Sequence, residues 1–261
     1  MIKFIATDID GTLLHSDQTL PNDLPQVINK LHEQNILFSV ASGRPYLTLK
    51  QSFESLNPNI VYIADNGSHV VYQGKEVAVH AIDNTIVKEL IHITRTLPCA
   101  YSVVCTTNGA YVESDEPAFL HELEKYYVKY TVVEDLTKLN ESVIKYTICD
   151  LTGAEENSYP HFLPYQEKVQ LSVAGFVWLD CMQKGINKGT AIKEIQDLYQ
   201  ITEEECMAFG DYLNDLEMMQ SVYYSYAMAN AHEDLKKVSR FETVSNDEDG
   251  VIITIKEMCD L

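Results

Sequence analysis

The first forty residues alternate between an apolar run, a helical pattern and a second apolar run, and this order restricts the fold more than any other feature. Residues 1–6 are short and mostly apolar, as expected of a strand that is covered on both faces. Residues 20–35 carry apolar side chains at helical spacing, and residues 36–41 form the second apolar run. Strand, helix and strand in so short a stretch indicate a βαβ unit, so we expect a parallel sheet with a right-handed crossover.

Polar residues follow both predicted strands, at the edge where open α/β sheets bind ligands. Asp8 and Asp10 lie at or just past the end of the first strand, and Ser42 ends the second. Gly11 lets the backbone turn away sharply. Because two carboxylates this close repel each other, a divalent metal or a shared proton is needed to keep both ordered. An Asx turn leaving the strand is the plainer interpretation of the Asp-x-Asp pair.

Two later stretches carry side chains of the same kind. Lys188 begins a helical pattern, while Asp211, Asn214 and Asp215 follow the apolar run 206–209. At this spacing the three side chains share one face of a short turn, which suits metal binding. Taken alone, Lys188 is typical of a solvated lysine, and the acidic group is typical of a helix N-cap.

The regular alternation of strand and helix stops near residue 83 and returns after residue 183. Between these points the patterns predict helices over 84–96 and 117–130, and several strands in hairpins, without a βαβ order. We therefore expect an α/β fold with a Rossmann-like, doubly wound parallel-sheet core domain formed by residues 1–82 and 184–261. Residues 83–183 are expected to form an inserted α+β domain.

Four motifs occur in the order typical of one family. They are Asp-Ile-Asp-Gly-Thr at 8–12, Val-Ala-Ser-Gly-Arg at 40–44, Asn-Lys-Gly-Thr at 187–190 and Gly-Asp-Tyr-Leu-Asn-Asp at 210–215. The series resembles the haloacid dehalogenase (HAD) superfamily of aspartate-nucleophile phosphatases.

Ala-Asp-Asn-Gly at 64–67 and Met-Ala-Asn-Ala at 228–231 resemble further landmarks of its Cof-like sugar-phosphatase branch, whose members carry an inserted cap of the C2 type. The correspondence runs from residue 4 to about residue 231. Tyr212 and Ala229 depart from the pattern beside matched positions, which bears on the substrate more than on the reaction.

The resemblance implies phosphoryl transfer through an enzyme aspartate. Asp8 would attack phosphorus and form an aspartyl-phosphate, with Asp10 as the general acid and base. Mg²⁺ would be held by the side chains of Asp8 and Asp211 and by the backbone carbonyl of Asp10, with Asp215 steadying the ion and its waters. The phosphoryl group would contact Ser42, Gly43, Lys188 and Asn214. The inserted domain would be the cap that chooses the leaving group.

Acidic residues outnumber basic ones by 39 to 19, which gives a net charge of −20. This charge opposes binding to nucleic acid or to an acidic membrane surface, whereas a small phosphate ester remains admissible where a metal and nearby cations supply positive charge. No apolar run of 18 residues and no signal-peptide pattern occur, so we expect a soluble, cytoplasmic protein. Six cysteines without a C-x-x-C pair indicate reduced core residues.

We therefore expect a Mg²⁺-dependent phosphatase that hydrolyses small phosphate monoesters such as sugar phosphates, with no protein partner implied. Three alternatives stay open: a phosphomutase of the same superfamily, a catalytically idle protein that binds a metabolite, and a phospho-receiver module. A receiver module is much shorter than this chain and has no use for the insert. The intact Asp8 and Asp10 argue against an idle protein.

Overall fold

The computed structural model describes residues 1–261, which group into two compact units. Unit 1 comprises Met1–Ser42, Leu49–Ala78 and Asn187–Leu261, and unit 2 comprises Gly43–Thr48 and Val79–Ile186. The short segment that follows Ser42 in the chain therefore packs with unit 2. The predicted domain bounds stay a prediction, because packing contacts by themselves do not show which part of a chain folds on its own.

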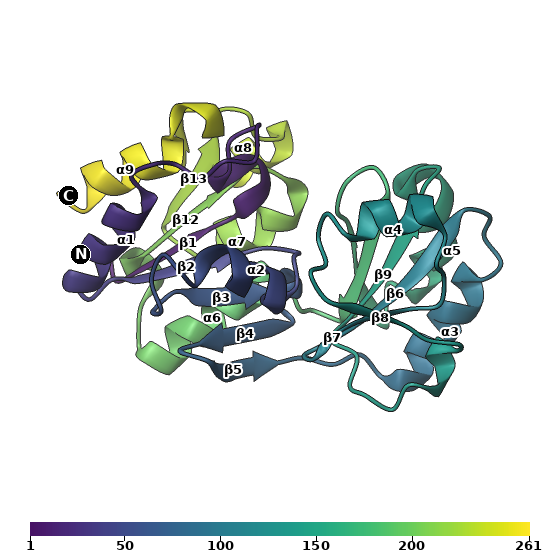
Figure 1. Ribbon diagram of the computed structural model, residues 1–261. Coiled ribbons are helices and arrows are strands. Elements are labelled where there is room, and N and C mark those ends of the chain that lie inside the picture. Colours follow the sequence, from purple (N-terminus) through teal and green to yellow (C-terminus); the bar gives the residue numbers. More distant parts are fainter. The chain divides into compact units, whose positions relative to one another are not determined.

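Unit 1 is built on an eight-stranded sheet of order β14-β13-β12-β1-β2-β3-β4-β5, in which β1 lies between β12 and β2 (Figure 1). Neighbouring strands from β14 to β3 are parallel, and β4 runs antiparallel to β3. The predicted α/β fold with a parallel-sheet core is confirmed. The strands are β1 Phe4–Thr7, β2 Leu37–Ala41, β3 Val61–Ala64, β4 His69–Tyr72, β5 Lys75–Val79, β12 Cys206–Gly210, β13 Tyr224–Met228 and β14 Phe241–Thr243.

The helices of unit 1 each bury an apolar face. In α1 the buried residues Leu24, Val27, Ile28 and Leu31 follow the helical spacing of the sequence, and Pro25 lies in the first turn, where its missing N–H costs little. Helix α1 packs beside α9, and α6 packs against α7 (Figure 1). The helices are α1 Leu24–Glu33, α2 Tyr46–Phe53, α6 Lys188–Tyr199, α7 Leu216–Gln220, α8 Glu233–Val238 and α9 Gly250–Met258.

Unit 2 contains a six-stranded, mostly antiparallel sheet of order β10-β11-β9-β6-β7-β8. Strand β9 buries side chains on both faces: Tyr146 and Ile148 join one apolar cluster, and Cys149 joins another that contains Phe119 and Leu123. This arrangement fits the expected α+β class. The elements are α3 Asn84–Thr94, β6 Ala100–Thr106, β7 Gly109–Val112, α4 Pro117–Leu123, β8 Tyr130–Val132, β9 Lys145–Asp150, α5 Tyr159–Phe162, β10 Val169–Val173 and β11 Trp178–Gln183.

Two expectations for this part of the chain are wrong. The helix expected over 117–130 ends at Leu123, because the following chain reaches back to pair strand β8 with β7. Cys99 is exposed rather than part of the core, since it lies in the turn before β6 with a φ of 58°. The other cysteines are buried, and all are free thiols. No helix in the structure has both the length and the apolar character needed to cross a bilayer.

Gly189 lies where α6 meets α7. A Cβ atom at this position would lie 2.4 Å from the backbone carbonyl oxygen of Glu217, a clash that side-chain rotation cannot relieve. We expect Gly189→Ala to lower the free energy of unfolding by about 1–3 kcal/mol, as overpacking does. Urea unfolding followed by circular dichroism measures this change.

The matched control is Lys193→Ala, an exposed position on the same helix, which should change the unfolding free energy by no more than about 0.5 kcal/mol. Equal free energies of unfolding for the two variants would show that α6 and α7 can move apart at this contact without a loss of stability.

Candidate active site

The parallel pairing of β1 with β12 brings the first and fourth motifs together. Thr7 pairs with Phe209, and the N–H of Asp8 donates to the Phe209 carbonyl at 2.9 Å, so Asp8 and Asp211 leave neighbouring strands at the same edge. The single turn η1 (Ile9–Leu13) follows, with Gly11 at a φ of 80°. A Cβ atom on Gly11 would lie 2.4 Å from Asp211 Oδ2, so both the φ angle and the space require glycine here.

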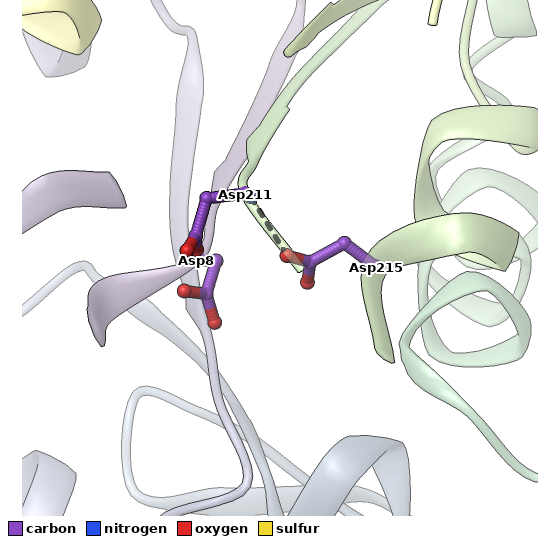
Figure 2. A group of neighbouring side chains, drawn as sticks. All are labelled: Asp8, Asp211 and Asp215. Atoms are coloured by element: carbon purple, nitrogen blue, oxygen red, sulfur yellow. Dashed lines mark hydrogen bonds between the residues drawn. The ribbon is translucent and has the colours of Figure 1, made fainter. Parts of the chain in front are cut away.

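Three carboxylates meet beyond these strands. Asp8, Asp211 and Asp215 each offer one oxygen, and these atoms all lie within 4.8 Å of one another. Figure 2 shows the carboxylates of Asp8 and Asp211 close together, with Asp215 joined to Asp211 by a hydrogen bond. Asp215 Oδ2 accepts from the backbone N–H groups of Asp211 at 3.1 Å and Tyr212 at 3.3 Å. These bonds hold the fourth motif as a compact turn.

Lys188 is the cation of the cluster. Its Nζ donates to Asp8 Oδ1 at 2.5 Å and to Asp215 Oδ1 at 2.7 Å, and its side chain is completely buried. The residue begins α6, where Asn187 caps the helix by accepting from the Thr190 N–H at 2.9 Å. The helix start therefore fixes the position from which this ammonium group reaches the carboxylates.

One ammonium faces three carboxylates, and the pKa values reflect this shortage of positive charge. Burial raises the pKa of Asp8 well above its ordinary value, Lys188 offsets only part of the rise, and Asp215 and Asp211 add to it. Burial and then Asp215 raise the pKa of Asp211 to about 6. Burial alone would lower the pKa of Lys188, but Asp215 and Asp8 outweigh it, and the pKa is raised.

The donor set fits a hard divalent cation such as Mg²⁺. The available atoms are oxygens, as Mg²⁺ prefers, and the cluster carries more negative charge than Lys188 can neutralise. Thr12 Oγ1 donates to Asp211 Oδ1 at 2.9 Å and so orients this carboxylate. Asp10 is not one of these three carboxylates, and the contact of its backbone carbonyl with the ion stays a prediction.

The residues expected to bind phosphate lie in different surroundings. Ser42 is buried at the end of β2, one residue beyond the level of Asp8 in the β1–β2 register. Asn214 Nδ2 donates to Asn66 Oδ1 at 3.4 Å. Gly43 groups with unit 2, where its carbonyl accepts from Lys145 Nζ at 2.5 Å. The phosphate contacts of these residues stay predictions.

Sequence reasoning did not assign site roles to two asparagines that the structure joins to the motifs. The N–H of Asn66 donates to the Ser42 carbonyl at 3.0 Å, and Asn66 adopts a φ of 55°, as does its neighbour Asp65 at 51°. Such angles are uncommon outside glycine, and asparagine and aspartate adopt them more readily than most other residues. Asn230 Nδ2 donates to the carbonyl of Gly11 at 2.8 Å. The available signals were the Ala-Asp-Asn-Gly run at 64–67 for Asn66 and the Met-Ala-Asn-Ala run at 228–231 for Asn230, neither of which indicates what the asparagine contacts.

The chain matches a family model described as haloacid dehalogenase-like hydrolase over residues 5–255. It is 26% identical over 268 residues to a 5-amino-6-(5-phospho-D-ribitylamino)uracil phosphatase of Escherichia coli K12, covering 98% of this chain and 96% of that protein. A Bacillus subtilis 168 protein with the same enzyme name is 25% identical over 265 residues, with 97% and 96% covered. A crystal structure of SMU.1108c from Streptococcus mutans UA159 superposes with a TM-score of 0.91, at 27% identity and 100% coverage of both chains.

Asp211 offers a test of the electrostatic cost of the cluster. Its carboxyl has a pKa raised to about 6, so the folded protein holds the proton more tightly than the unfolded chain, and stability falls as pH rises from about 4 through 6. Asp211→Asn removes the charge and keeps an oxygen that can accept from Thr12. In metal-free protein at pH 7.5 we expect the variant to be more stable than the native protein by about 1–2 kcal/mol.

Urea unfolding in the presence of a chelator measures this difference, which should disappear at pH 4.5, where the native Asp211 is itself protonated. Glu242→Gln, an exposed position in β14, is the control and should alter stability little at either pH. A variant that is less stable than the native protein at pH 7.5 would contradict the assigned charge penalty.

Proposed function

The chain belongs to the family of haloacid dehalogenase-like hydrolases and is a phosphoric monoester hydrolase, and from this premise we propose that it works through an aspartyl-phosphate on Asp8 with the aid of Mg²⁺. The observation that carries the proposal is the bond from the buried Lys188 to Asp8, in a cluster that also contains Asp211 and Asp215. This arrangement keeps the carboxylate at the end of β1 oriented and partly neutralised by Lys188, as a nucleophile that attacks an anion requires, and the charge that Lys188 leaves uncompensated suits a divalent ion.

Asp8 acts as the nucleophile. Lys188 holds Oδ1, which leaves Oδ2 to attack the phosphorus of a bound ester. The new bond joins Oδ2 to phosphorus, and the bond from phosphorus to the leaving oxygen breaks. The positive charge of Lys188 also screens Asp8 from the incoming dianion. Phosphoryl transfer depends mainly on such positioning and charge neutralisation, because the transition state spreads negative charge over the phosphoryl oxygens.

Asp10 acts as the general acid and then as the general base. It gives its proton to the leaving oxygen in the first step. In the second step it takes a proton from the water that attacks phosphorus, the bond between phosphorus and Asp8 breaks, and inorganic phosphate leaves. Acid and base catalysis of this kind contributes on the order of 10² to 10⁴ in rate.

Mg²⁺ would be held by the side chains of Asp8 and Asp211 and by the backbone carbonyl of Asp10. Asp215 supports the turn that carries Asp211 through its bond to the Asp211 N–H. When bound, the ion neutralises negative charge on the phosphoryl oxygens. Ser42, Gly43, Lys188 and Asn214 are the proposed partners of those oxygens.

We propose small phosphorylated polyols and sugars as the substrates. Two relatives at 25–26% identity are named for an ester that carries a phosphorylated ribityl group, which is itself a polyol phosphate. The proposed cap, residues 83–183, would select among leaving groups. The net charge of −20 supports a small substrate rather than a polyanion.

The experiment that tests this function measures free phosphate released from a panel of sugar and polyol phosphates. We expect release that requires a divalent metal, and Asp8→Asn should lose more than about 10³-fold in kcat, because the variant lacks the nucleophile. Radiolabelled phosphate should be trapped on Asp8 of the native enzyme.

Each contrary result has a distinct meaning. Label found on another residue would contradict the assignment of Asp8. Transfer of phosphate between positions of a sugar, without free phosphate, would show a mutase instead of a hydrolase. Full activity after exhaustive chelation, with metal absence verified by elemental analysis, would exclude the metal requirement.

Asp10→Asn separates the two chemical steps through the leaving group. An alkoxide is strongly basic and needs a proton as it leaves, whereas p-nitrophenolate hardly needs one. We expect the variant to lose far more kcat/KM on a sugar phosphate than on p-nitrophenyl phosphate, with a burst of one p-nitrophenolate per enzyme before slow turnover. Equal losses on both esters and no burst would show that Asp10 does not transfer protons.

A further inference from the structure

Two asparagine side chains bond to the segment that directly follows Asp10. Asn230, in the turn after β13, donates from Nδ2 to the carbonyl of Gly11 at 2.8 Å. Asn246, in the turn η8 (Asn246–Glu248) before α9, is buried and donates from Nδ2 to the carbonyl of Leu14 at 2.8 Å. Hydrogen bonds therefore fix both ends of the stretch from Gly11 to Leu14.

The two asparagines are joined to each other and to the fourth motif. Asn230 Oδ1 accepts from the N–H of Asn246 at 3.2 Å, so both ends of the Asn230 amide are used although the residue is exposed. The turn that carries Asn230 is tied to Asp211 by the N–H of His232, which donates to the Asp211 carbonyl at 2.8 Å. Asn230 thus connects its own turn both to the segment after Asp10 and to the turn η8.

Gly11 is the position in this segment where the backbone has the most conformational freedom. Asp10 has φ and ψ angles of −79° and 115° within the turn η1, and Gly11 has a φ of 80°. Glycine adopts many backbone conformations at similar cost, so a free Gly11 would let the direction of the Asp10 side chain vary. The bond from Asn230 restrains the peptide group between Gly11 and Thr12 and thereby restricts this freedom.

We propose that Asn230 is a positioning residue for the acid and base step, assisted by Asn246, and that it acts by keeping Asp10 directed at the leaving oxygen. The inference rests on the proposed role of Asp10. It adds a residue from the turn after β13 and one from η8 to a reaction otherwise carried by the four motifs. A proton donor must lie within hydrogen-bond reach of the leaving oxygen. If the position of the Asp10 side chain varies, the rate therefore falls more for esters with strongly basic leaving groups than for esters with weakly basic ones.

The test compares kcat/KM on a sugar phosphate with kcat/KM on p-nitrophenyl phosphate, because their ratio reports protonation of the leaving oxygen. Asn230→Leu keeps the size and branching of the side chain but removes both hydrogen bonds. We expect it to lower the ratio about tenfold, a part of the 10²- to 10⁴-fold that such catalysis contributes. Asn230→Ser is a smaller change that serves the same purpose should the leucine variant fail to fold.

Asn57→Ala is the matched control. Asn57 also uses both ends of its amide, donating to Asn29 Oδ1 at 2.9 Å and accepting from the N–H of Asn59 at 2.8 Å, but it contacts none of the motifs through these bonds. This variant should lose thermal stability without changing the ratio.

A second comparison places Asn230→Leu on an Asp10→Asn background, where we expect no further fall in the ratio.

The outcomes separate the inference from the function on which it rests. If Asp10→Asn lowers the ratio and Asn230→Leu does not, or if Asn230→Leu lowers it equally on the Asp10→Asn background, the positioning role is overturned and the proposed function stands. If Asp10→Asn itself leaves the ratio unchanged, the acid role of Asp10 fails, and the inference fails with it.

Discussion

The buried ammonium group of Lys188 holds together carboxylates that would otherwise repel one another. It bonds to Asp8 and Asp215, which lie 180 and 27 residues away in the sequence. A buried charge of this kind is tolerated only when it is paired and hydrogen-bonded, so each partner depends on the others. The start of α6, the end of β1 and the turn after β12 must therefore lie together for any one of them to be stable.

The ratio of positive to negative charge in this cluster explains why the site is suited to phosphate chemistry. One cation against three acids leaves the cluster short of positive charge, which burial intensifies and which shows in the raised pKa values of Asp8 and Asp211. A divalent ion supplies what is missing, and a phosphoryl group then meets oriented positive charge rather than bare carboxylates. Stability given up in the metal-free site is typical of functional sites, which are rarely optimised for folding alone.

The sheet and its helices hold these charged side chains in fixed positions. Strand β1 is fully buried between β12 and β2, and Gly11 and Gly189 allow contacts that any side chain would prevent. Around this rigid part, Asn66, Asn230 and Asn246 bind the turns to one another through backbone carbonyls or N–H groups. Rigid strands thus carry the charged groups, and amide side chains hold the turns that aim them.

The sequence alone determined the fold class and the four motif positions, because apolar runs and helical spacing are local properties and parallel strands must end at one edge. It also determined the family, since several motifs in a fixed order are rarely accidental. It failed for the helix over 117–130, where pairing of β8 with β7 overrides local pattern, and for the exposed Cys99. Only the tertiary structure decided that Lys188 bonds to Asp215 as well as to Asp8, and that Asn230 and Asn246 hold the Gly11–Leu14 stretch. The physical reason is that a bond from a side-chain amide to a distant carbonyl depends on where two turns meet in space, and neither turn carries a periodic pattern that reveals its partner.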